Sequence, residues 1–598
     1  MDDATLRSAH TFSIPVMGTG FLVDTPLKVA RYGISSVISL VDDSLIEQMR
    51  RFHLEQEGEP YEEIGGDEED ARARRITAYL DLVDRLVARQ VRQLQASPFE
   101  PGSEITRYFE MLPTCGLQQA YREMLATADP QQRAERQEQL RPLAVPGSID
   151  VNIMSKLDRT VYRDGEPLPA KYSDAAAALR GFALSTVRSA MVFSAGMNPR
   201  LYSYLAEFEG FFPDLAGVCA KRIILKVSDY HSATVQGKYL AKRGLWVSEY
   251  RIESGLNCGG HAFATKGLLL GPILEEFRKN RHELGEQLRA AYYQALTRAG
   301  RPLPARAPEI RVTVQGGIGT AEEDRMLRDC YGVEGTGWGT PFLLVPEATS
   351  VDPEHLVKLA AATEEDVYLS ECSPIDVPIW TLRNSASENM RRERIARGAP
   401  GSPCSKGHAK LYNTEFTEEP ICTASRQYQR MKLAQLAKED LPEEQRERLR
   451  QSVLAKACIC HDLAGGATLK YGIDLAATPA ICCGPNIVNF SKIATLDEMV
   501  GHIYGRLSLL VNPNRPHMFL KELALYIDHL SQESEKYAAG LSARTPEYLS
   551  EFRENLLCGI EHYRQLAGSF VEELKSQFLE GLEKLNSLLD ETVLTPVS

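Results

Sequence analysis

The sequence contains no apolar run that approaches the roughly 18–20 residues needed to cross a bilayer. Its first residues, MDDATLRSAH, carry acids where a secretory leader carries bases. We therefore expect a cytoplasmic protein with no membrane partner. Basic charge is also scarce, because 68 Lys and Arg stand against 81 Asp and Glu, a net charge of −13. Nucleic acid is an unfavoured partner for such an acidic chain, since its phosphates must be neutralised.

Cysteine is too infrequent for a disulfide scaffold, at 12 of 598 residues. No C-x-x-C pair occurs, so the zinc ribbon and the bacterial ferredoxin signature are both excluded. Seven of the twelve nevertheless fall between residues 372 and 483. In a reducing compartment they are expected to be thiols, metal ligands or catalytic groups.

Short apolar runs rich in Val and Ile recur along the first 345 residues, with helical spacing between most of them. Such runs are typical of parallel strands that are buried on both faces. There are eight, at 12–18, 35–40, 148–155, 190–196, 222–228, 250–256, 310–316 and 332–344. Eight alternating strand–helix units predict an α/β fold, the (β/α)₈ TIM barrel.

The spacing of the runs also divides the chain. Residues 43–142 predict a helical insertion after the second strand, which we expect at the active-site face as a lid or oligomer contact. The expected domains are the barrel at 1–365, a cysteine-rich segment at 366–490 and a helical region at 491–598. The amphipathic helices of the last region are expected to pack on the barrel or on a second copy, and we expect a homo-oligomer.

Glycines follow the seventh and eighth predicted strands, in Gly316-Gly317-Ile318 and in Gly337-Trp338-Gly339-Thr340. Loops at these two positions are the usual phosphate site of such barrels, because glycine lets backbone N–H groups come close to a phosphate. The sixth unit presents His261 after Gly259 and Gly260, where a neutral imidazole can act as a general base. Cys258, just before it, is a candidate nucleophile or redox thiol.

These motifs, taken in order, resemble the nitronate monooxygenase (2-nitropropane dioxygenase) family of FMN enzymes, which includes an FMN-dependent enoyl-ACP reductase. The resemblance covers roughly residues 12–350. It includes Pro15–Gly18, like the family's P-M-x-G turn, and Val151–Ile153, like its V-N-[LIF] strand. Residues 192–199 resemble V-S-F-x-x-G-x-P, and residues 253–261 resemble E-A-G-G-H with three extra residues. The two glycine loops resemble G-G-I and G-T-x-F.

The resemblance implies FMN as cofactor and His261 as the catalytic base. It implies flavin contacts from Met17, Gly18, Asn152, Gly260, Gly316, Gly317, Ile318, Gly339 and Thr340. Two lysines, Lys156 and Lys226, are further candidates to balance the charge of reduced flavin. Lys156 ends a V-N-x-M-[ST]-K stretch that is similar to one in the flavin barrel of glutamate synthase. The longer loop before His261 leaves the substrate open.

The cysteine-rich segment offers thiols in Gly- and Pro-rich loops, where a [4Fe–4S] cluster would find four ligands. Our candidates are Cys404, Cys422, Cys458 or Cys460, and Cys483. A zinc site that uses Cys404 with His408, or Cys460 with His461, is the alternative, and buried inert thiols are the third possibility.

The sequence therefore predicts an FMN-dependent oxidoreductase, with an iron–sulfur cluster as a possible electron donor to the flavin. Its small activated substrate would be a nitronate-like anion to oxidise or an enoyl-type double bond to reduce. NAD(P)H or an electron-transfer protein is the expected redox partner. The alternative is a non-redox barrel, an isomerase, lyase or sensor, that binds a phosphorylated metabolite and carries structural zinc.

Overall fold

A closed barrel of eight parallel strands lies at the centre of the computed structural model, which describes residues 9–194, 196–258, 265–411, 413–538 and 544–591. The strands are β1 (Phe12–Ile14), β2 (Ser35–Ser39), β3 (Ile149–Ile153), β6 (Ala190–Phe193), β7 (Arg222–Val227), β8 (Val247–Glu253), β9 (Arg311–Gln315) and β10 (Gly335–Gly337). Neighbours in the barrel follow chain order, and β10 pairs with β1 to close it. Each strand overlaps one of the eight apolar runs, so the predicted (β/α)₈ barrel is confirmed.

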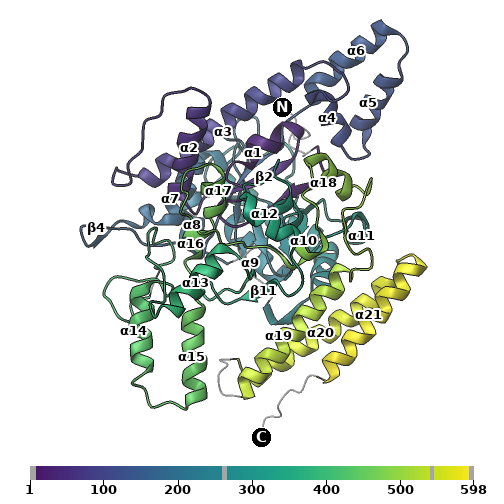
Figure 1. Cartoon of the computed structure of the whole chain (residues 1–598). Coiled ribbons are helices and arrows are strands. Elements are labelled where there is room, and N and C mark those ends of the chain that lie inside the picture. The colour runs from purple at the N-terminus through teal and green to yellow at the C-terminus, as the bar shows by residue number, and fades with distance from the viewer. Residues whose placement is uncertain (1–8, 195, 259–264, 412, 539–543, 592–598) are drawn as a thin grey trace.

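Helices surround this barrel (Figure 1). They are α1 (Thr25–Val29), α3 (Ala71–Ala96), α7 (Asp174–Leu184), α8 (Pro199–Leu205), α9 (Tyr230–Ala241), α10 (Leu270–Arg298), α11 (Ala321–Tyr331) and α12 (Pro353–Ala360). Helix α3 packs against both α1 and α7, the place of the helix that follows the second strand. Its Ile76, Leu80, Val83 and Val87 repeat at helical spacing and are buried toward the barrel.

The expected insertion divides between the two ends of the barrel. Helix α2 (Asp43–Gln56) starts at the carboxyl end of β2, on the active-site face. Helices α4 (Glu104–Met111), α5 (Gly116–Ala126) and α6 (Pro130–Leu140) follow α3 and lead into the amino end of β3. They therefore lie toward the opposite face, where α5 and α6 project (Figure 1). The expectation of a lid was wrong for α4–α6, because the chain had already returned along α3.

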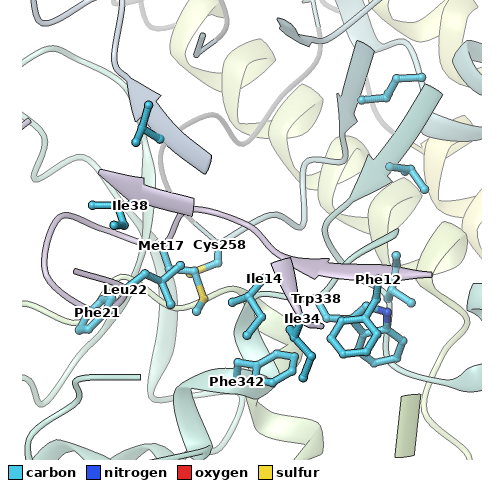
Figure 2. Packing of buried hydrophobic residues seen from close by; sticks show 14 of the residues in the cluster. Phe12, Ile14, Met17, Phe21, Leu22, Ile34, Ile38, Cys258, Trp338 and Phe342 are labelled. Atoms are coloured by element: carbon cyan, nitrogen blue, oxygen red, sulfur yellow. The ribbon is translucent and has the colours of Figure 1, made fainter. Parts of the chain in front are cut away.

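The barrel interior is polar at both ends and apolar only in a narrow middle layer. That layer consists of Val37, Ala190, Val192 and Ile224. The larger core lies between the strands and the outer helices, where Phe12 stacks on Phe342 at 6.0 Å between ring centroids (Figure 2). A polar interior at the carboxyl ends of the strands is what a barrel enzyme needs in order to present functional side chains.

The chain after the barrel starts with the hairpin β11 (Val367–Ser370) and β12 (Ile379–Leu382) and continues through short helices. These are α13 (Ala386–Ala396), α14 (Arg426–Leu436), α15 (Glu443–Ala455), α16 (Ile459–Asp462) and α17 (Gly465–Lys470). The pair α14 and α15 projects from the body (Figure 1). We call residues 371–379, 404–410 and 457–486 the cap, because they lie over the carboxyl ends of the barrel strands.

The last part of the chain is helical, as expected. It comprises α18 (Leu496–Ile503), α19 (Met518–Ala538), α20 (Pro546–Ala567) and α21 (Glu572–Glu591). Helices α19–α21 pack together, and α20 also contacts α10 of the barrel (Figure 1). Within the described part of the chain, no helix is both long enough and apolar enough to cross a bilayer.

The turn into β3 supplies a test of the packing. A side chain on Gly147 would overlap the backbone of Ile34 at the start of β2. We expect Gly147→Ala to lower the free energy of unfolding by about 2 kcal/mol or more, since the clash is with backbone that cannot move aside. Gly116→Ala is the matched control, because nothing lies near a side chain at that position. Equal unfolding midpoints for the two variants in urea would contradict this packing.

Candidate functional site

A cavity lies between the barrel mouth and the cap. It encloses about 930 Å³ of space that no protein atom fills, part of it open to solvent. The barrel contributes Val16, Gly18, Thr19, Ser39, Val41, Asn152, Met154, Leu157, Ser194, Lys226, Asn257 and Cys258. The cap contributes Ser373, Pro374, Ile375, Val377, Ile379, Ala409, Ile459, Cys460, Leu463 and Cys482.

A buried ion pair forms part of the cavity floor. Lys226, at the end of β7, lies 2.8 Å from the carboxylate of Glu253, at the end of β8. The same carboxylate oxygen accepts hydrogen bonds from Asn257 at 2.6 Å and from Gln315 at 2.9 Å. Glu253 thus ties together the carboxyl ends of three neighbouring strands. The sequence placed Lys226 at this mouth but did not predict that Glu253 would neutralise it.

Asn152 and Lys156 follow one another along the third strand and its loop. The Asn152 side chain accepts a hydrogen bond from the Ser194 hydroxyl at 3.3 Å, and its own amide donates to no residue that the structure describes. Burial lowers the pKa of Lys156, against the opposing charge of Glu253. The carbon chain of the Lys156 side chain lies next to Gly196, and Lys156 is not among the residues that line the cavity.

Cys258 reaches the cavity from the loop after β8. Its thiol donates to the backbone carbonyl of Cys482 at 3.0 Å. The adjacent Cys482 thiol, together with burial, raises the pKa of Cys258 well above its ordinary value. A thiol held in its protonated form is a poor nucleophile at neutral pH. His261 and Gly260, predicted as catalytic base and flavin contact, lie outside the described residues.

The two glycine loops lie side by side at the ends of β9 and β10. Gly316 and Gly317 have positive φ angles of 102° and 78°, and side chains there would meet Asn257 and Leu256. The backbone N–H groups of Gly317, Ile318, Gly339 and Thr340 donate to no acceptor in the described part of the chain. Four free amides at two adjacent loops are what an anionic group such as a phosphate binds.

The cap approaches the same loops. The N–H of Gly484 donates to the Thr340 hydroxyl at 3.2 Å, and the Asn486 side chain donates to the Ile318 carbonyl at 2.9 Å. Gly484 has no room for a side chain here, because Thr340 and the backbone of Leu256 lie against it. A phosphate would therefore reach the free amides only from the side that residues 484–486 leave uncovered.

A buried ion pair between Arg515 and Glu323 forms a second contact of the later chain with the loop after β9. Glu323 pairs with Arg515 and accepts the N–H of Gly319 at 2.8 Å and the N–H of Met518 at 2.7 Å. Both side chains are nearly inaccessible to solvent. The contacts of Gly484, Asn486 and Arg515 with the barrel loops were missed from the sequence, because they join residues that are more than 140 positions apart.

The predicted metal ligands come together only in part. Cys404, Cys422 and Cys458 are close enough that charge on one disfavours charge on another, and Cys458 adjoins Cys460. Cys483 lies instead beside Cys482. No group of three or more His, Cys, Asp or Glu side chains within the described ranges is arranged to hold a metal ion. The structure therefore does not support the predicted iron–sulfur or zinc site.

His408 and His461, the zinc alternatives, have other neighbours. The ring of His461 lies 3.0 Å from Asp462. His408 lies between Asp174 at 3.7 Å and Asp42 at 3.8 Å, and Lys406 pairs with the same Asp42. Asp42 follows β2 and Asp174 begins α7. This buried charge cluster fastens the cap to the rim of the barrel.

Comparisons with known proteins assign the chain to no family. No family model matches the chain, and no curated protein matches it either. Among solved structures the chain is similar to FabK from Thermotoga maritima, at 11% identity and a TM-score of 0.37. That alignment covers 84% of this chain and 95% of the other. The TIM-barrel assignment rests on the closed eight-stranded sheet itself.

The Lys226–Glu253 pair can be tested by removing one or both charges. Lys226→Met leaves a buried carboxylate without its cation, and we expect it to cost about 3 kcal/mol in free energy of unfolding. The double variant Lys226→Met/Glu253→Gln removes both charges and is expected to recover part of that loss. Denaturant titration of the three proteins measures the difference. A double variant less stable than Lys226→Met would contradict the pairing.

The His408 cluster predicts a pH dependence. Burial alone would lower the pKa of His408, but Asp174 and Asp42 outweigh burial and the pKa is raised. Its contribution to stability is then fully present below the unfolded value of about 6.5 and is lost as pH rises through the raised pKa. We expect the thermal stability gap between the wild type and His408→Asn to be largest at acidic pH and to shrink above neutrality. A gap that widens with rising pH would contradict the ion pairs.

Proposed function

We propose that the protein is an FMN-dependent oxidoreductase that reduces an activated, uncharged double bond in the cavity between barrel and cap. The observation that carries the proposal is the position of that cavity. It lies at the carboxyl ends of the barrel strands, and Gly18, Asn152 and Lys226 from three different strands meet there. Two adjacent loops with free amides lie at the same face.

The residues at the mouth fit a flavin mononucleotide in several respects. The free amides of the β9 and β10 loops suit its phosphate. The open side-chain amide of Asn152 and the buried, unpartnered hydroxyl of Thr19 suit the polar edge of its ring. The apolar side chains of the cap suit its face. Bound there, the flavin would supply hydride transfer, which no side chain of the protein can perform.

The chemistry of the lining favours a neutral substrate over a nitronate anion. Lys226 is the one charged side chain among the described lining residues, and Glu253 already neutralises it. An anion entering this cavity would lose its hydration without gaining a free cation, at a cost of several kcal/mol. Ile375, Val377 and Ile379 of the cap would instead pack against an apolar molecule. This supports the enoyl-type reduction that the sequence left open.

The protein's own residues then have distinct tasks. The cap excludes water from the reacting centre, because its apolar side chains roof the cavity. Asn152, held by Ser194, orients the cofactor ring, and the Lys226–Glu253 pair keeps the floor polar without net charge. Cys258 keeps its proton because its pKa is raised, so it does not add as a nucleophile to the electrophilic double bond of the substrate.

The experiment is flavin binding followed by turnover. Apo protein titrated with FMN is expected to bind it at a ratio of about one and to oxidise NAD(P)H when given an enoyl thioester, with little turnover of a nitronate. Asn152→Ala is expected to weaken FMN binding about tenfold through loss of one or two hydrogen bonds. Fluorescence quenching of FMN measures the affinity.

Ser148→Ala is the matched control, since Ser148 lies at the opposite end of the same strand and bonds Asp150. Equal loss of affinity in both variants would assign the effect to general destabilisation. A protein that binds a sugar phosphate but no FMN would replace the oxidoreductase with the non-redox alternative. Faster turnover of a nitronate than of the enoyl thioester would overturn the substrate class.

A further inference from the structure

Three cysteine thiols from separate segments line the cavity. Cys258 comes from the loop after β8, whereas Cys460 and Cys482 come from the cap. Cys258 and Cys482 are in direct contact, because the Cys258 thiol donates to the Cys482 carbonyl at 3.0 Å. Gly484, two residues after Cys482, lies against the same loop, since a side chain built on it would come within 3.5 Å of the Cys258 nitrogen.

The location of this pair is unlike that of an ordinary core thiol. Both residues lie in irregular loops, where the backbone can adjust to the geometry that a disulfide requires. Both are about 97% shielded from solvent, at 3% exposure each, yet both face the cavity. The neighbouring Cys483, at 0% exposure, is not among the lining residues given for the cavity.

We propose that Cys258 and Cys482 form a redox-active dithiol that exchanges two electrons with the group bound in the cavity. This rests on the proposed function in that the group is an oxidised flavin. The two S–H bonds break and one S–S bond forms, with release of two electrons and two protons. Both electrons and one proton pass to the oxidised flavin, and the second proton passes to water. The reverse reaction regenerates the two thiols.

Burial makes the exchange selective. The cap covers both thiols, so bulky disulfides in solution cannot reach them. Because the pKa of Cys258 is raised, the thiolate fraction at neutral pH is small, and only an oxidant held next to the thiol reacts with it at an appreciable rate. Oxidation therefore requires an oxidant that can enter the cavity, such as a bound flavin or the small reagent diamide. It also joins residues 258 and 482, and so fixes the cap to the barrel in the oxidised state.

The test counts electrons and maps the disulfide in the same protein. FMN-loaded protein is oxidised with diamide, freed of reagent and titrated with dithionite without oxygen. The wild type is expected to take up about four electrons per flavin, and Cys258→Ser and Cys482→Ser about two. Peptide mapping of the oxidised wild type is expected to find a Cys258–Cys482 disulfide. Cys483→Ser, the matched control, is expected to retain four electrons and the disulfide.

Two electrons in the wild type with both thiols free would overturn the proposal, as would a disulfide confined to Cys458 and Cys460. Mapping of diamide-treated protein that holds no FMN separates the two proposals. A Cys258–Cys482 disulfide in protein that fails to bind FMN would keep the redox pair and reject the flavin. Free thiols in such protein would reject both.

Discussion

A single carboxylate oxygen of Glu253 binds three side chains. Lys226 forms an ion pair with it, and the side-chain amides of Asn257 and Gln315 donate hydrogen bonds to it. A buried carboxylate is costly unless it is paired, and this one is paired by donors from β7, from β9 and from the loop after β8. The position of Cys258 depends on it, because Asn257 precedes that cysteine directly. The interactions of Glu253 therefore determine three features together: the polar floor of the cavity, the spacing of three strand ends and the direction of the loop after β8.

The cap is as much a part of the site as the barrel. Gly484 and Asn486 contact the loops that follow β10 and β9, respectively. Leu463 contacts the turn after β1. Lys406 and His408 contact the end of β2, and His408 also contacts the start of α7. These contacts are mostly hydrogen bonds between a backbone group and a side chain, together with buried ion pairs, and both are specific in geometry. A barrel without the cap would expose an apolar and partly charged mouth to water.

The fold could be predicted from the sequence because buried parallel strands appear as continuous Val- and Ile-rich runs, which long-range contacts do not obscure. The place of Lys226 at a strand end followed from the same runs, whereas Asn152 was singled out by the family resemblance. Gly484, Asn486, Arg515 and Glu323 could not be predicted, since their roles arise from pairings across more than 140 positions that no local pattern records. The thiols were recognised as unusual, but spacing alone did not reveal that the Cys258 thiol of the barrel contacts Cys482 of the cap, while Cys483 lies apart from Cys404.

The order of the chain gives the cap a consequence for biosynthesis. All eight barrel strands are complete by residue 337, whereas the segment that fastens the cap to the β9 and β10 loops ends near residue 486. A nascent chain folds its amino-terminal part first as it leaves the ribosome. For the time needed to make some 150 further residues, at roughly 5–20 residues per second, the roof over the barrel mouth is incomplete. A cofactor that meets the protein in this interval enters an open site, and the finished chain then closes over it.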